Sequence, residues 1–162
     1  MRRFILLLAA MSAALVVVGG VALAVTKVGG PEGDTLMGTK GPDKLLGKGG
    51  SDWIDGRGGK DVIRGGPGND NPLSPSIGIL DGGPGADVIW GGPGIDMLLD
   101  GSRGRRDSAV DTLRGGDGND DLLTYNRPAA RDIVNCGAGG RDSAEVDRKD
   151  VVRDNCEKVG MH

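Results

Sequence analysis

A nine-residue repeat begins at Gly29 and runs for five copies without a gap. The copies start at Gly29, Gly38, Gly47, Gly56 and Gly65. The sixth residue of every copy is an aspartate: Asp34, Asp43, Asp52, Asp61 and Asp70. The eighth residue is apolar in the first four copies, where it is Leu36, Leu45, Ile54 or Ile63. In the fifth copy it is Pro72. A repeat that combines glycine turns, one carboxylate and one apolar residue predicts a solenoid whose loops bind a hard cation.

The repeat resumes further along the chain, with insertions. Regular copies span residues 82–90, 91–99 and 115–123. Residues 71–78 are read as an insertion before a strand at Ile79–Asp81, and residues 100–114 and 124–135 as units with extra residues. Degenerate units follow at 137–145 and 146–153. We expect the insertions after Asp70 and before Asp111 to interrupt the stack.

Each unit has a simple physical reading. Glycines at positions 1, 2 and 4 permit positive φ, so the first six residues can form a tight loop. Positions 7–9 then form a short strand, whose alternation points position 8 inward and positions 7 and 9 outward. Two units would make one coil, with strands stacked in parallel about 4.8 Å apart. The predicted fold is an all-β parallel solenoid.

Alternation also sorts the aspartates between two edges. Asp34, Asp52, Asp70, Asp96 and Asp120 should line one edge. Asp43, Asp61, Asp87 and Asp111 should line the other. Stacked carboxylates among glycine-loop carbonyls make an all-oxygen cage, which suits calcium better than zinc or copper. Magnesium is disfavoured because it retains water and demands stricter octahedral geometry.

Several copies resemble a known family motif. GGPGNDN, GGPGADVIW, GGPGIDMLL and GGDGNDDLL are similar to the RTX, or hemolysin-type, calcium-binding nonapeptide GGxGxDxUx, closely over residues 29–123 and loosely over 124–159. The resemblance implies a right-handed parallel β-roll with two nonapeptides per coil. It also implies several Ca²⁺ ions, held by position-6 aspartates and loop carbonyls, and folding on calcium binding after export.

The candidate calcium ligands follow from the motif and the register. The carboxylates are those of Asp34, Asp43, Asp52, Asp61, Asp70, Asp87, Asp96, Asp111 and Asp120. The loop carbonyls lie around Gly65, Gly66, Gly68, Gly82, Gly83, Gly85, Gly91, Gly92, Gly94, Gly115, Gly116 and Gly118. Position 2 departs from glycine at Thr39, Lys48 and Arg57, and position 4 at Glu32, so the early sites should be weaker. Sites that involve Asp70, Asp87 and Asp96 should bind best, because their own loops read GGPGxD.

Composition supports a need for metal. Of 162 residues 32 are glycine and only 2% are aromatic, which is too little for a conventional core. Bound metal can supply the missing free energy. The alternative is a flexible glycine-rich tract, which does not explain aspartate and leucine in phase. The net charge of −3 argues against nucleic acid or an anionic membrane as partner.

The N-terminus indicates export. Residues 1–24 combine Arg2 and Arg3, an apolar run and an Ala22-Leu23-Ala24 cleavage motif, so they read as a signal peptide. An uncleaved anchor is the alternative, because residues 4–25 carry no charge and could span a bilayer. We divide the remainder into a short linker (25–28), the calcium-binding roll (29–123) and a C-terminal cap (124–162).

The two cysteines, Cys136 and Cys156, predict a disulfide that staples the last coil, with two free thiols as the alternative. Catalysis is not expected, since the one histidine is His162 and the serines Ser102 and Ser143 lack a base. The chain reads as a secreted calcium-binding protein without membrane insertion after cleavage. A cell-surface adhesion or structural solenoid, with a cell-surface or polysaccharide partner, is the alternative. An ice-binding array is disfavoured by the mixed outward residues.

Overall fold

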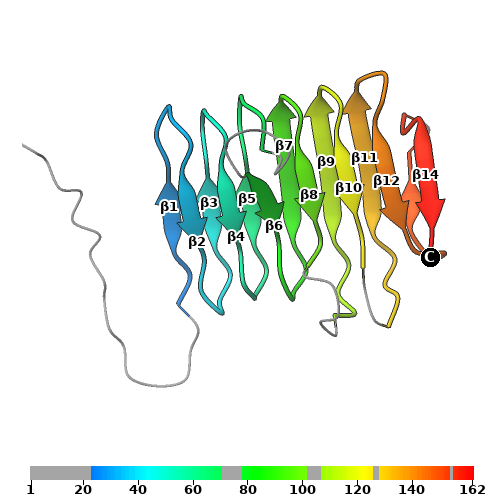
Figure 1. Cartoon of the computed structure of the whole chain (residues 1–162). Coiled ribbons are helices and arrows are strands. Elements are labelled where there is room, and N and C mark those ends of the chain that lie inside the picture. Colours follow the sequence, from blue (N-terminus) through cyan, green and yellow to red (C-terminus); the bar gives the residue numbers. More distant parts are fainter. Residues whose placement is uncertain (1–22, 71–77, 102–106, 126–127, 154) are drawn as a thin grey trace, which may run out of the picture.

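The computed structural model describes residues 23–70, 78–101, 107–125, 128–153 and 155–162. Within these ranges the structure is an all-β parallel solenoid of two seven-stranded sheets (Figure 1). The first sheet holds β1 (Thr26–Val28), β3 (Lys44–Leu46), β5 (Val62–Arg64), β7 (Val88–Pro93), β9 (Thr112–Asp117), β11 (Ile133–Ala138) and β13 (Val151–Val152). The second holds β2 (Thr35–Met37), β4 (Trp53–Asp55), β6 (Ile79–Asp81), β8 (Met97–Leu99), β10 (Asp121–Leu123), β12 (Ser143–Val146) and β14 (Lys158–Met161).

Successive strands alternate between the two sheets, and each pairs in parallel with the second strand along the chain. In the block without insertions, Thr35 pairs with Trp53 and Lys44 with Val62, 18 residues apart in each case. The loops that join the sheets therefore stack at two edges, above and below the strands in Figure 1. Most strands span the three residues predicted from positions 7–9, but β7, β9 and β11 continue for six residues.

The core is a double row of position-8 side chains, as the alternation predicts. Ile63, Ile89 and Leu113 are paired neighbours in the first sheet, and Leu80, Leu98 and Leu122 are paired neighbours in the second. All six are fully buried. Because each strand contributes essentially one inward side chain, the apolar core is narrow. Other interactions in the loops must supplement it.

The expectation that the insertions interrupt the stack is wrong. β4 pairs with β6 across the first insertion, so that Ile54 still lies opposite Leu80. β7 pairs with β9 across the second, so that Ile89 lies opposite Leu113. A ladder needs only that the flanking strands meet, and a loop can lengthen at small entropic cost. The inserted residues 71–77 and 102–106 lie outside the described part of the chain.

Both ends of the solenoid hold a strand that the repeat did not predict. Thr26–Val28, in the segment expected to be a linker, form β1 and pair with β3. Lys158–Met161 form β14 and pair with β12. Hydrogen bonding to an existing edge recruits these residues although they lack the motif.

The disulfide between Cys136 and Cys156 is present, with the Cα atoms 5.2 Å apart. Cys136 is buried and joins the core, while Cys156 packs against it. Gly137 pairs with Gly116, the second residue of its loop, so Cys136 takes the place of a position-1 glycine. The unit read as starting at Gly137 therefore starts one residue earlier.

The predicted signal peptide or anchor lies almost wholly outside the described residues. No helix of sufficient length and apolar character to cross a bilayer occurs in the part of the chain that is described.

Candidate metal centre

A column of aspartates follows one edge of the solenoid. Each member precedes a strand of the second sheet or its insertion. From the second member on, its Oδ1 accepts a hydrogen bond from the backbone N–H of the member before it. The donor–acceptor distance is 2.7 Å from Asp52 to Asp70 and 3.0 Å from Asp96 to Asp120. We call this column the first ladder; it contains Asp34, Asp52, Asp70, Asp96, Asp120 and Asp142.

The opposite edge carries an equivalent column, the second ladder. The backbone N–H of Asp61 donates to Oδ1 of Asp87 at 2.7 Å, and that of Asp87 to Oδ1 of Asp111 at 2.6 Å. The members of the second ladder are Asp43, Asp61, Asp87, Asp111, Asp132 and Asp150. The two-edge arrangement of the position-6 aspartates is therefore present as the alternation predicts.

Among the residues that the structure describes, the second oxygen of most of these carboxylates has no hydrogen-bond partner. Oδ2 is buried without a hydrogen-bond partner at Asp52, Asp61, Asp70, Asp87, Asp96, Asp111, Asp120 and Asp142. A buried carboxylate oxygen without a partner is energetically costly, and a repeated series of them points to a missing counter-charge. An oxygen-seeking divalent cation meets that need, so the residues present fit calcium.

The first aspartate of each ladder, Asp34 or Asp43, differs from the later members in the hydrogen bonding of its Oδ2 atom. At Asp34 and Asp43, Oδ2 accepts the backbone N–H of Gly30 (2.6 Å) and Thr39 (2.5 Å), respectively. Asp34 is also only partly buried. These two carboxylates therefore need a cation less than those of the interior, whereas Oδ2 of Asp52 and Asp61, in the loops that carry Lys48 and Arg57, is unpartnered. The weakness of the early sites stays a prediction.

Burial raises the pKa values of the interior aspartates. Loss of hydration is the main cause; the backbone N–H bond to each carboxylate opposes it, and the neighbouring ladder charges add to it. The pKa rises to about 7 at Asp70, about 8 at Asp96 and about 9 at Asp87. Without metal, Asp70, Asp87 and Asp96 therefore hold protons near neutral pH, and a bound cation would displace them.

Position-1 glycines make room for the unpartnered oxygens. A Cβ placed on Gly65 would lie 2.0 Å from Oδ2 of Asp70, and one on Gly91 would lie 2.4 Å from Oδ2 of Asp96. A Cβ on Gly82 would lie 2.6 Å from Oδ2 of Asp87, and one on Gly115 would lie 2.3 Å from Oδ2 of Asp120. A larger residue that kept this backbone would fill the space at the carboxylate.

Position 2 has a left-handed backbone in most of the regular loops, although not at Gly30 or Thr39. The predicted carbonyl-bearing glycines at positions 2 and 4 have positive φ, from 80° to 153°: Gly66, Gly68, Gly83, Gly85, Gly92, Gly94, Gly116 and Gly118. Lys48 and Arg57 occupy position 2 with φ of 84° and 74°. The stacked loops impose the conformation on them, since Lys48 N–H bonds to the Gly65 carbonyl at 2.8 Å. The two loops keep the fold of the repeat at the expense of backbone strain.

All nine predicted aspartates lie on one ladder or the other, but three ladder members were not among them. Asp132, Asp142 and Asp150 each precede a strand, and that position was the available signal. Asp100, a buried aspartate of a different kind, was also missed. It stands where the repeat has its first glycine, and no feature of the motif marks that position as a ligand.

A family model supports this reading of the site. The model of the RTX calcium-binding nonapeptide repeat matches four times, at residues 28–59, 37–71, 79–98 and 107–124, which together cover half of the chain. The chain belongs to the RTX calcium-binding repeat family. Comparisons with curated proteins and with solved structures found no match.

Membership of the RTX family makes this a calcium-binding repeat protein with a parallel β-solenoid fold. Such repeats are typically structural and calcium-binding rather than catalytic. The aspartates of the two ladders stack against backbone in regular columns. This arrangement suits the holding of cations.

Proposed function

We propose that this RTX chain is an exported protein that binds several Ca²⁺ ions along both ladders and completes its folding when they bind. The ions would lie at the loops, held by ladder carboxylates and loop carbonyls of a right-handed β-roll with two nonapeptides per coil. The buried, unpartnered Oδ2 atoms carry the proposal, since each needs a cation or a proton.

The proposed folding switch follows from the charge of the ladders. Successive aspartates of a ladder lie one strand spacing apart, so their ionised forms repel one another. The apolar core is one side chain wide per strand and offers little to offset that repulsion. Calcium would neutralise the carboxylates and couple its binding free energy to folding. Outside the cell calcium is abundant, and the predicted N-terminal signal would deliver the chain there.

Circular dichroism of the full chain, titrated with Ca²⁺ and back-titrated with EDTA, tests this function. We expect β-structure to increase with Ca²⁺ and to be lost with EDTA, while Mg²⁺ at the same concentration does little. An identical spectrum in Ca²⁺ and in EDTA, together with no bound calcium on equilibrium dialysis, would contradict the proposal.

An adhesive role is a second candidate, favoured by one surface feature. On the outer face of the first sheet, the guanidinium groups of Arg64 and Arg114 flank the ring of Trp90, 4.8 and 5.7 Å from its centroid. A partly exposed aromatic between two cations suits an anionic polysaccharide. Binding to immobilised alginate that is lost in Trp90→Ala but kept in Trp53→Ala would favour this role, and no binding by the calcium-loaded chain would exclude this ligand.

A further inference from the structure

Asp100 occupies the first position of its loop, where the preceding loops carry glycine. Its backbone N–H bonds to the Leu123 carbonyl, as that of Gly82 bonds to the Leu99 carbonyl. The position is thus the same in the stack, but the side chain is a carboxylate. Asp100 is only 1% exposed, so this carboxylate lies inside the edge of the solenoid.

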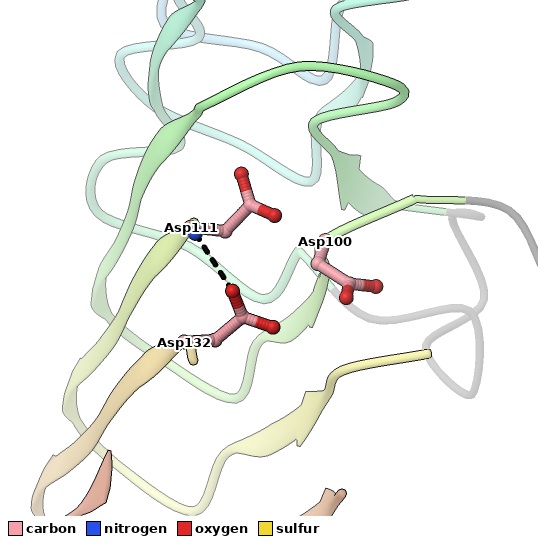
Figure 2. Close-up of side chains that lie close together, drawn as sticks. All are labelled: Asp100, Asp111 and Asp132. Atoms are coloured by element: carbon pink, nitrogen blue, oxygen red, sulfur yellow. Dashed lines mark hydrogen bonds between the residues drawn. The ribbon is translucent and has the colours of Figure 1, made fainter. Parts of the chain in front are cut away.

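Three aspartates from different loops converge there. Asp100 follows β8, Asp111 precedes β9 and Asp132 precedes β11. One carboxylate oxygen from each lies within 4.8 Å of the others, and all three residues are buried (Figure 2). The N–H of Asp111 donates to Oδ1 of Asp132 at 2.8 Å, which sets the spacing of the two ladder members. Asp100 adds a third carboxylate that a regular loop of the repeat does not possess.

Within the described part of the chain, Oδ2 of Asp111 finds no partner among the groups around the cluster. Asp111 has 0% exposure, so this oxygen is buried. Both oxygens of Asp100 share one donor, the backbone N–H of Tyr125, at 3.0 and 2.8 Å. Among the described residues, the charges that act on Asp100 are those of further carboxylates, at Asp132, Asp107 and Asp150.

We propose that Asp100 joins Asp111 and Asp132 in a three-carboxylate calcium site, in which two neighbouring members of the second ladder gain a third ligand and bind calcium more tightly than a regular ladder site does. This site rests on the proposed calcium-binding function and specifies which residues would hold one of the bound ions. Calcium affinity in oxygen sites rises with the number of charged ligands, and a third carboxylate adds one. This ion would be the last to leave when calcium is withdrawn.

The test counts the ions that resist removal. Wild-type protein and two variants, Asp100→Asn and Asp117→Asn, are dialysed against rising EGTA, and the retained calcium is measured by mass spectrometry. Asn at position 100 keeps the size of the side chain and an acceptor for the Tyr125 N–H while removing the charge. Asp117 is an exposed carboxylate of β9, so its variant controls for net charge. We expect Asp100→Asn to lose one tightly held ion per chain, with affinity for that ion weaker by about tenfold or more, and Asp117→Asn to match the wild type.

Two further measurements keep the test decisive. Asp100→Gly restores the residue that the repeat uses at this position, and it should fold and show the same loss. A crystal structure of the wild-type chain with calcium should show one ion bound by all three carboxylates at about 2.3–2.6 Å. Equal calcium retention by Asp100→Asn and the wild type, or a calcium-loaded crystal without an ion between the three carboxylates, would overturn the site while leaving the ladder sites intact. A wild-type chain that binds no calcium would instead reject the proposed function itself.

Discussion

The backbone N–H of Asp70 donates a 2.9 Å hydrogen bond to Oδ1 of Asp96, although 26 residues separate the two. The same bond joins Asp52 to Asp70, which are only 18 residues apart. The insertion after Asp70 therefore leaves the ladder spacing unchanged. The carboxylate column is maintained by stacking and does not depend on a constant repeat length.

Without metal, stability should fall as pH rises from about 4 to about 8. Burial raises the pKa of Asp61 and Asp120 to about 7 and that of Asp111 to about 8, from an ordinary value of 3.8. The folded state then holds more protons than the unfolded state in this range, so the free energy of unfolding decreases as these protons are lost. Far-UV circular dichroism in EGTA from pH 5 to pH 8 measures this as a loss of residual β-structure with rising pH. In saturating Ca²⁺ the trend should flatten or reverse, because calcium needs ionised carboxylates. More β-structure at pH 8 than at pH 5 in EGTA would contradict the prediction.

Interior ladder positions should bind calcium more tightly than the ladder starts. Asp96→Asn removes a charge at a buried carboxylate whose Oδ2 is unpartnered. Asp34→Asn makes the same change where Oδ2 already accepts the Gly30 N–H. We expect calcium affinity, measured by isothermal titration calorimetry, to fall by about tenfold or more at the affected site in Asp96→Asn and to change less in Asp34→Asn. Equal losses in the two variants would show that burial of the carboxylate does not determine affinity.

Replacing Lys48 by glycine should stabilise the protein. Lys48 has a φ of 84°, a conformation that costs a residue with a Cβ about 1 kcal/mol. Glycine relieves that strain but loses part of the gain through the greater entropy of the unfolded chain, so a net gain of about 0.5 kcal/mol is expected. Lys44→Gly is the matched control, since Lys44 lies in β3, where glycine should destabilise by about 0.5–1 kcal/mol. Chemical denaturation of both variants in Ca²⁺ measures the two effects, which should have opposite signs.

Removing the disulfide should destabilise the C-terminal end. Cys136 and Cys156 close a loop with a sequence separation of 20, which is worth about 3 kcal/mol in the chain-entropy model. The Cys136→Ala/Cys156→Ala variant should therefore melt at a lower temperature than the oxidised wild type in saturating Ca²⁺. Adding reductant should lower the melting temperature of the wild type and leave that of the variant unchanged. No shift in the reduced wild type would show that the bridge does not stabilise the fold.

Much of this architecture could be predicted from the repeat because each feature depends on residues that are close together in the sequence. An apolar residue two places after each aspartate identifies the inward side chain, as at Ile54 and Leu98, both fully buried. Alternation of loops assigns Asp87 and Asp96 to opposite edges, where the hydrogen bonds place them. These features depend on the period of a strand and the length of a loop, which neighbouring residues determine.

The prediction failed where a residue takes a role that the motif does not encode. Cys136 replaces a first-position glycine and moves the start of its unit by one residue, which only its pairing with the adjacent strand reveals. Lys158–Met161 become a strand because the edge of β12 offers backbone partners. The signal peptide, the calcium ligands themselves and export remain predictions from the sequence.

The sequence by itself determined the unit: a glycine loop, a carboxylate and one inward apolar side chain, repeated in phase. These features of the unit depend on φ/ψ preferences and on strand alternation, which involve only a few neighbouring residues. Only the tertiary structure decided which carboxylates meet. Asp100, Asp111 and Asp132 converge because three loops stack at one edge, and that contact depends on how the insertions are accommodated between paired strands.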